Sequence, residues 1–362
     1  MKEMDTEKMS IDSQYRQQGR LNLLDYTRFL AALMVIIYHW GYNGIRNGKI
    51  SSIDTFLPFA HWATMGYLGV HIFFMISGYV IAKSYQNKTA IEFAVGRFFR
   101  LYPSYWVALT ITTIVTLLWG YKNGLEIYPL QFLANLTMVS NLIGSTYVDG
   151  VYWTLEYELL FYILIFILML VGLKKYIFIF CIIWSLILSA IFFIGGPTPH
   201  HTYLDYYFTY FLTGMLISRY AQNRNIWILP VLGLSWVTNM GYAYKGVPQH
   251  IIEFNYYDSR LVAAVIIAAA GILIFSMSSI RVANASLPHA TFLGSLTYPI
   301  YLLHAHIGYI LLSIFASDEN RIVPYLLIGI VIFFMAWLLH ELVEVRLVPK
   351  MRRGIKRKLP DF

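Results

Sequence analysis

Three ionisable side chains lie inside one long apolar segment, Leu21 to Tyr42. The segment is long enough to span a bilayer, which takes about 20 residues, yet it carries Asp25, Arg28 and His39. An ionisable side chain at membrane depth costs at least about 2.5–3.5 kcal/mol, so chains keep it mainly where it lines a site or a water-filled path. On a helix, Arg28 and His39 lie about 20° apart in rotation and about 16 Å apart along the axis. This stripe would suit a long ligand with an anionic head and a reactive tail.

Two arginines and a glutamate extend the candidate site. Arg97 and Arg100 are three residues apart on one helix face, and paired guanidinium groups suit phosphate binding. Anchoring at the cytoplasmic membrane boundary explains the two arginines equally well. Glu158 lies about 10 Å from the outer end of its apolar segment, at a depth comparable to that of His39. Because a carboxylate commonly sets the tautomer of a neighbouring imidazole, we expect Glu158 to orient His39.

The composition indicates an integral membrane protein. Of the 362 residues, 58% are hydrophobic and 13% are charged, whereas a soluble protein carries about 25% charged residues. The net charge of +8 does not indicate nucleic-acid binding, because the basic residues lie between apolar segments and near the end of the chain. The single cysteine, Cys181, excludes an intrachain disulfide.

Hydropathy predicts an all-α polytopic protein of about ten transmembrane helices, at residues 21–42, 64–84, 101–119, 151–173, 176–194, 203–218, 226–244, 260–279, 292–314 and 322–346. With both termini cytoplasmic, the inner segments hold 20 of the 27 Lys and Arg residues and the outer segments hold six, as the positive-inside rule requires. We expect a flexible cytoplasmic lead-in without a signal peptide at 1–20, a single transmembrane domain at 21–346 and a basic cytoplasmic tail at 347–362.

Five segments occur in an order that resembles the bacterial acyltransferase-three family of integral membrane acyltransferases. They are LDYTRFLAALMVIIYH, LGVHIFFMISGYVI, RFFRLYPSYW, YWTLEYELLFY and LGSLTYPIYLLH, and the resemblance extends from about residue 21 to residue 346. It implies transfer of an acyl group, usually acetyl, from cytoplasmic acyl-CoA to a hydroxyl of a surface or exported polysaccharide. It also implies a multipass protein of the bacterial inner membrane. The expected partners are membrane lipids and a glycan or lipid-linked glycan acceptor, with no nucleic acid, no metal and no fused extracytoplasmic esterase-like domain.

The resemblance also assigns residues to roles. The catalytic residues are expected to be His39, Glu158 and Arg28, with His39 as general base or as a transient acyl carrier. The residues expected to bind acetyl-CoA or another acyl-CoA are Arg97, Arg100, Arg28, Phe73, Phe74 and Ser77. Those expected near the substrate or the oxyanion are Trp153, Tyr298, Tyr301 and His304. His71 and Glu156 depart from the family pattern, which leaves the identity of the acceptor open.

Alternatives to an enzyme are open from the residues alone. Asp25, Arg28, His39 and Glu158 could form the proton relay of a multispanning transporter. Such transporters often contain inverted repeats with matching broken helices, and no internal repeat is visible in this sequence. Asp25 and Arg28 could also form a structural ion pair, with His39 as an interfacial histidine.

Overall fold

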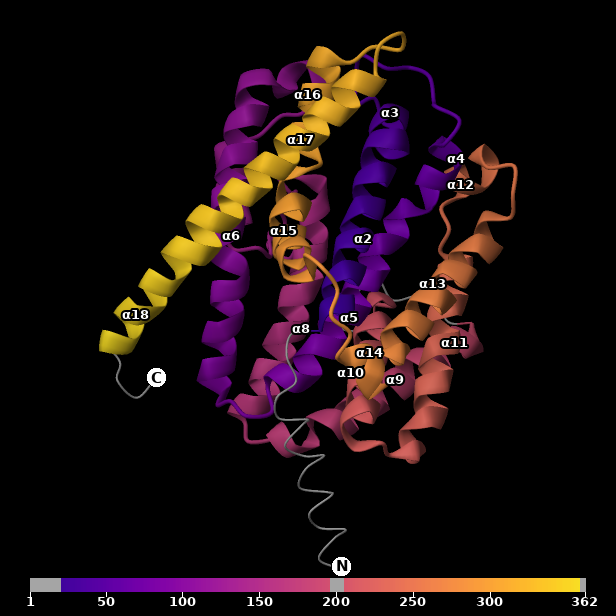
Figure 1. Ribbon diagram of the computed structural model, residues 1–362, viewed down its shortest axis with the longest axis vertical. Coiled ribbons are helices and arrows are strands. Elements are labelled where there is room, and N and C mark those ends of the chain that lie inside the picture. The colour runs from indigo at the N-terminus through magenta and orange to yellow at the C-terminus, as the bar shows by residue number, and fades with distance from the viewer. Residues whose placement is uncertain (1–20, 196–204, 359–362) are drawn as a thin grey trace, which may run out of the picture.

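The computed structural model describes residues 21–195 and 205–358, and all regular structure in these residues is helical (Figure 1). The predicted lead-in at 1–20 and the end of the predicted tail, 359–362, lie outside the described residues. The longer helices are α2 (Asn22–Tyr38), α5 (Gly69–Ser84), α6 (Ala90–Trp119), α8 (Trp153–Leu170), α9 (Ile177–Ile194), α10 (Tyr207–Asn223), α11 (Leu229–Lys245), α13 (Ser259–Ser276), α15 (Ala290–Leu303), α16 (His306–Phe315), α17 (Ile322–Leu339) and α18 (Val348–Lys358). The shorter helices are α3 (Gly44–Arg46), α4 (Ala60–Ala63), α7 (Pro129–Asn135), α12 (Gln249–Phe254) and α14 (Ile280–Ala283).

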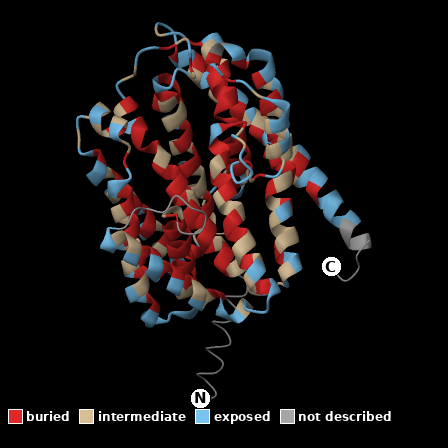
Figure 2. Cartoon of the chain, turned by 180° about the vertical axis from the view of Figure 1, so that it is seen from behind, coloured by how far each residue is buried: buried red, intermediate tan, exposed pale blue. Residues whose placement is uncertain are grey.

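Several of these helices can cross a membrane. Within residues 21–195 and 205–358, seven helical segments are long and apolar enough, and α15 with α16, bent by 72° at their junction, makes an eighth if the pair is one span. Buried residues gather inside the bundle (Figure 2), while large apolar side chains such as Leu117, Ile194 and Leu326 are exposed on its outside. Such an exposed apolar surface fits contact with lipid. The prediction of an all-α, membrane-spanning chain is therefore confirmed.

Helix α6 begins earlier than predicted. Hydropathy placed the start of this span at residue 101, but the helix starts at Ala90, because Thr89 and Glu92 form a reciprocal capping box. Pro103 consequently lies inside the helix. Arg97 and Arg100 therefore lie on a turn of the long helix itself, within reach of its neighbours in the bundle.

The helix that carries His39 changes its geometry at that residue. The α-helical part of α2 ends at Tyr38, and residues His39–Asn43 form a π-helical turn before α3. A π-turn shifts the rotation of every later side chain, and such turns occur frequently at functional sites. The N–H of His39 still bonds the Val35 carbonyl as in an α-helix, whereas the N–H of Gly44 bonds the His39 carbonyl as in a π-helix. The calculated stripe therefore extends from Arg28 to His39 and changes only after it.

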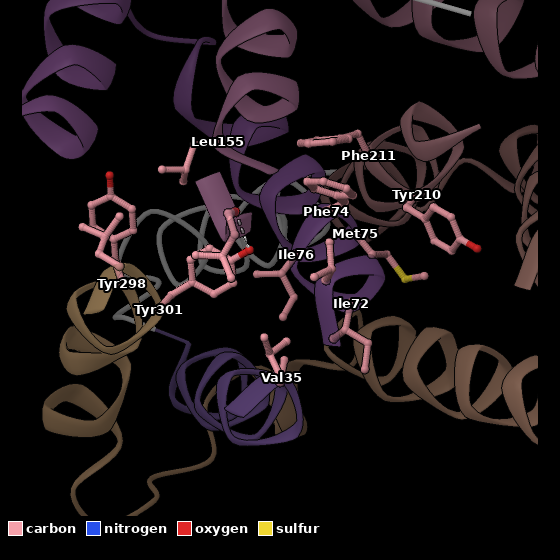
Figure 3. Close-up of a cluster of buried hydrophobic side chains, with 14 of the residues drawn as sticks. Val35, Ile72, Phe74, Met75, Ile76, Leu155, Tyr210, Phe211, Tyr298 and Tyr301 are labelled. Carbon is pink, nitrogen blue, oxygen red and sulfur yellow. Dashed lines mark hydrogen bonds between the residues drawn. The ribbon is translucent and has the colours of Figure 1, made fainter. Parts of the chain in front are cut away.

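Glycines let the central helices approach closely. An added Cβ at Gly78 on α5 would clash with the backbone carbonyl of Phe211 on α10, and one at Gly214 would clash with the carbonyl of Met75. Small residues at such crossings are typical of membrane helix packing. Figure 3 shows the result, with Phe74 stacked on Phe211 and with Tyr298 and Tyr301 of α15 facing the same core. This packing fixes α5, which forms a wall of both cavities described below.

Candidate active site

An inner cavity of about 210 Å³ lies among α2, α5, α6, α8 and α15. Its charged residues are Arg28, Arg97, Arg100 and Glu158, three cations and one anion. The cavity thus brings Arg28 together with the pair Arg97 and Arg100, as the sequence predicted for a phosphate-binding site. The other predicted residues that line it are Phe73, Phe74, Ser77, Tyr298 and Tyr301.

The guanidinium groups of the inner cavity are held at its wall by different partners. Arg28 lies 4.0 Å from the Asp25 carboxylate. The Arg97 guanidinium carbon lies 5.5 Å from the centre of the Tyr162 ring, which is a cation–π distance. Glu158 accepts a hydrogen bond from Ser77 Oγ at 2.9 Å and another from the Tyr162 hydroxyl. The cations outnumber the anion, so the cavity can attract an anionic ligand such as a phosphate.

Arg100 has a partner that sequence reasoning missed. Its guanidinium lies 3.8 Å from Glu344, which also accepts hydrogen bonds from Ser104 Oγ at 3.2 Å and interacts with His340 Nδ1 at 2.8 Å. Glu344 belongs to a π-helical segment, His340–Leu347, that continues α17. The available signal was the spacing of His340 and Glu344, four residues apart at the end of the apolar span and hence on one helix face.

An outer cavity of about 320 Å³ contains His39. His71 and His306 also line it, together with one lysine, Lys49, and one carboxylate, Asp149. Unlike the inner cavity, it carries imidazole groups and no arginine among the described residues. Val70 and Tyr301 line both cavities, so the two spaces meet at these side chains.

His39 is held by residues other than the predicted one. Its Nδ1 lies 2.5 Å from the Tyr309 hydroxyl and 3.4 Å from Asn43 Nδ2. Glu158 lines the inner cavity instead, so the expectation that it orients His39 is wrong. Although His39 and Glu158 were predicted at similar depths, their side chains line different cavities. Tyr309 is 270 residues away along the chain, and no sequence spacing connects it to His39.

His304 and Tyr301 lie beside His39. The rings of His39 and His304 are 5.2 Å apart between centroids. Since a carbonyl only accepts, His304 Nδ1 donates to the Tyr301 backbone carbonyl at 2.9 Å, which leaves the proton off Nε2 in the neutral ring. The Tyr301 hydroxyl lies 2.7 Å from Thr154 Oγ1 and donates to the Val151 carbonyl at 3.1 Å. Both residues are thus fixed by hydrogen bonds, but only Tyr301 lines the cavities, whereas His304 is fully buried behind them.

The remaining predicted residues have different surroundings. Tyr298 donates its hydroxyl proton to the Leu101 carbonyl at 3.0 Å at the inner cavity, and Trp153 lines the outer cavity. Glu156 accepts hydrogen bonds from the Tyr147 hydroxyl at 3.1 Å and the Asn141 backbone at 3.2 Å. Glu156 therefore anchors the loop before α8. In the residues that the structure describes, no group of three His, Cys, Asp or Glu side chains is arranged to hold a metal.

His306 and Asp149 form a contact at the outer cavity, although the sequence assigned neither residue a role. In the structure Asp149 is fully buried, and one of its carboxylate oxygens accepts the backbone N–H of His306 at 3.0 Å. The other oxygen lies 4.0 Å from His306 Nε2 and accepts the N–H of Val151 at 3.2 Å. The available signal in the sequence was the position of Asp149, a single carboxylate directly before the predicted span at 151–173.

The chain matches the acyltransferase domain family called acyltransferase-three over residues 21–341. Nodulation protein 10 of Rhizobium leguminosarum bv. viciae is 27% identical over 169 residues, which are 42% of this chain and 45% of that protein. Exopolysaccharide production protein ExoZ of Rhizobium meliloti (strain 1021) is 34% identical over 110 residues, 28% of this chain and 34% of that protein. The putative membrane-bound transacylase BcsY of Komagataeibacter xylinus is 22% identical over 324 residues, 81% of this chain and 74% of that protein.

The chain matches less than half the length of the first two of these relatives. No solved structure matches it. The family match includes α2, the histidines of the outer cavity and the arginine pair of α6, so it covers the whole site described above. The chain belongs to the acyltransferase-three family.

Proposed function

We propose that the protein is an integral membrane O-acyltransferase that moves an acyl group, acetyl in the simplest case, from cytoplasmic acyl-CoA to a hydroxyl of a surface or exported polysaccharide. The observation that carries the proposal is the pair of cavities that meet at Val70 and Tyr301, one rich in arginine and the other rich in histidine. The names of two relatives, an exopolysaccharide production protein and a transacylase, support an acyl transfer to a polysaccharide.

The inner cavity is the proposed site of the acyl donor. Arg28, Arg97 and Arg100 bind the phosphates of CoA, since guanidinium groups match phosphate oxygens in charge and geometry. Phe73 and Phe74 of α5 supply apolar wall along the path from these arginines toward Val70. The pantetheine arm lies along this path, so the thioester reaches the place where the two cavities meet.

His39 is the proposed general base. When its Nδ1–H donates to the Tyr309 oxygen, the lone pair of the neutral ring is on Nε2, which can then accept a proton. Nε2 takes the proton of the acceptor hydroxyl as that oxygen attacks the thioester carbonyl carbon. The C–S bond then breaks, and the thiolate receives the proton from His39, so the imidazole returns to its neutral form. Tyr301 lines both cavities here, and its hydroxyl can stabilise the negative charge of the tetrahedral state when it turns from the Val151 carbonyl toward that oxygen. His304, which has no proton on Nε2 while Nδ1 donates to the Tyr301 carbonyl, can do so only once Nε2 is protonated.

The proposed topology has ten spans with both termini cytoplasmic. Helices α2 and α10, of 17 residues each, add two spans to the seven apolar segments and the bent pair. This arrangement puts the start of α6, and hence Arg97 and Arg100, toward the cytoplasm, where acyl-CoA is made. It also puts His39 toward the outer side of a bacterial inner membrane, where the acceptor glycan is exposed.

The donor half of the proposal is tested by thermal unfolding of the purified protein with CoA or acetyl-CoA. Both ligands should raise the melting temperature, because a ligand that binds the native state stabilises it. Arg97→Ala with Arg100→Ala should weaken the affinity at least about tenfold, since a hydrogen bond to a charged group contributes about 1.5–3 kcal/mol.

The matched control is Arg281→Ala, which removes an exposed arginine on α14. This variant should bind CoA as the wild type does. A wild-type melting temperature that does not respond to either ligand would overturn the assignment of the inner cavity to an acyl-CoA.

A further inference from the structure

The outer cavity contains buried hydrogen-bonding atoms without a partner. His306 is 7% exposed, and its Nδ1 has no hydrogen-bond partner among the described residues. Tyr67 is half-buried, but its hydroxyl oxygen is inaccessible to solvent and, within the same described ranges, also unpaired. Both residues line the cavity. His71 Nδ1, on a third lining residue, is also unpaired among the described residues. Because buried polar groups in folded proteins are nearly always paired, three unpaired groups around one cavity point to a polar ligand.

The His306 ring is held in place so that one nitrogen is available. Asp149, which is fully buried, accepts the backbone N–H of His306 and faces the Nε2 side of its ring at 4.0 Å. His306 is also the first residue of α16, directly after the 72° break with α15. With its backbone and its Nε2 side held by one carboxylate, the ring offers Nδ1 to a ligand. Asp149 acts through His306 and is a positioning residue.

The walls of the outer cavity are aromatic and its charges cancel. Tyr38, Trp153 and Tyr207 line it, and the rings of Trp153 and Tyr207 lie 4.9 Å apart between centroids. Its only permanently charged side chains in the described ranges are Lys49 and Asp149, one of each sign. A mainly aromatic wall with a few fixed polar groups is typical of sites for small organic ligands. A sugar ring has apolar C–H faces, which can pack on aromatic rings, and hydroxyl groups at its edge. Because the charges of Lys49 and Asp149 offset each other, the outer cavity suits an uncharged sugar.

We propose that His306, oriented by Asp149, and Tyr67 bind hydroxyl groups of an uncharged sugar unit of the acceptor. They thereby determine which acceptor is used. The inference rests on the proposed function, in which the outer cavity receives the acceptor, and it adds the class of sugar and the residues that recognise it. His306 and Tyr67 contribute binding to the acceptor, while the acceptor proton goes to His39.

The test uses simple probes in place of the acceptor, since methyl glycosides present one sugar ring each. Purified protein with saturating acetyl-CoA is given the methyl glycosides of glucose, galactose, mannose and N-acetylglucosamine, and methyl glucuronide as the charged counterpart. Acetylated product is measured by mass spectrometry over a range of probe concentrations. We expect the wild type to acetylate at least one neutral probe with a lower KM than methyl glucuronide.

The variants are His306→Gln and Tyr67→Phe. Each should raise the KM for the best neutral probe about fivefold, the effect of one hydrogen bond of about 1 kcal/mol, with kcat close to the wild-type value. The stabilisation by acetyl-CoA should not change. His61→Gln is the matched control, because His61 lies on α4, bonds Asn255 at 3.2 Å and does not line the cavity.

Three results would overturn the inference. A change in kcat without a change in KM in Tyr67→Phe, which is the milder variant if His306→Gln does not fold, would remove these residues from acceptor binding. A preference for methyl glucuronide over every neutral probe would exclude an uncharged sugar. Acetylation of none of the probes by protein that acetyl-CoA still stabilises would reject the sugar subsite alone, whereas loss of that stabilisation in the wild type would reject the proposed function.

Discussion

The two cavities of this bundle differ in the kind of charge they carry. The inner cavity has three guanidinium groups, whose planar geometry matches that of phosphate oxygens, and one carboxylate. The outer cavity has three imidazole groups, with Lys49 and Asp149 offsetting each other. Permanent cations suit the binding of an anion, and imidazoles suit the transfer of a proton near neutral pH. We therefore expect mutations in the inner cavity to change the affinity for the acyl donor, and mutations in the outer cavity to change the rate of transfer to the acceptor.

The largest separation is expected from His39→Ala. The variant should lose acyl transfer by about 10²–10⁴-fold, because that is the usual contribution of a positioned general base. Its stabilisation by acetyl-CoA should remain, since the arginines that we propose bind the donor lie in the other cavity. Transfer is measured with purified protein, and binding is measured by thermal unfolding. Wild-type activity in this variant would remove His39 from the mechanism.

An intermediate effect is expected where the cavities meet. Val70 is 8% exposed and lines both cavities, so Val70→Phe should obstruct the contact between donor and acceptor. A misplacement of about 1 Å can cost about 10²-fold in rate, and we expect a loss of this order with the affinity for CoA retained. Val70→Leu, which adds one methylene, should lose less. Equal activity of both variants and the wild type would show that transfer does not pass this point.

Much of the inner cavity could be predicted from the sequence. Arg28 was singled out because an ionisable residue in an apolar span is costly, and Arg97 and Arg100 because paired guanidinium groups suit phosphate binding. All three lie toward the same end of their helices, so their common depth was predictable, whereas their convergence on one cavity depends on how the helices pack. The helical class was also predictable, because apolar segments of span length have few other structures available in a membrane.

The outer cavity could be predicted only in part. His39 and Trp153 were found, but Tyr309, Asp149 and His306 were not assigned. Their contacts depend on the π-turn at His39 and on the break between α15 and α16, and both change the rotation of side chains in ways that regular helical spacing does not describe. The depth of a residue along its helix follows from its residue number. Which side chains of other helices lie opposite it depends on how whole helices pack.

The smallest effect we predict separates the two candidate partners of His39. Tyr309→Phe removes the hydroxyl that lies 2.5 Å from His39 Nδ1, so kcat should fall about fivefold, the effect of one lost hydrogen bond, with no change in the affinity for CoA. Glu158→Gln alters the inner cavity, where Glu158 bonds Ser77 and Tyr162, and should change the affinity for CoA instead.

The double variant turns this difference into a measurement. Tyr309 and Glu158 share no hydrogen-bond partner among the described residues and line different cavities, so their effects on transfer should add within about 0.3–0.5 kcal/mol. The single and double variants are compared by kcat/KM for acetyl-CoA. A coupling free energy well above that range would mean that Glu158 acts on His39 during acyl transfer. The two cavities would then not act independently in that step.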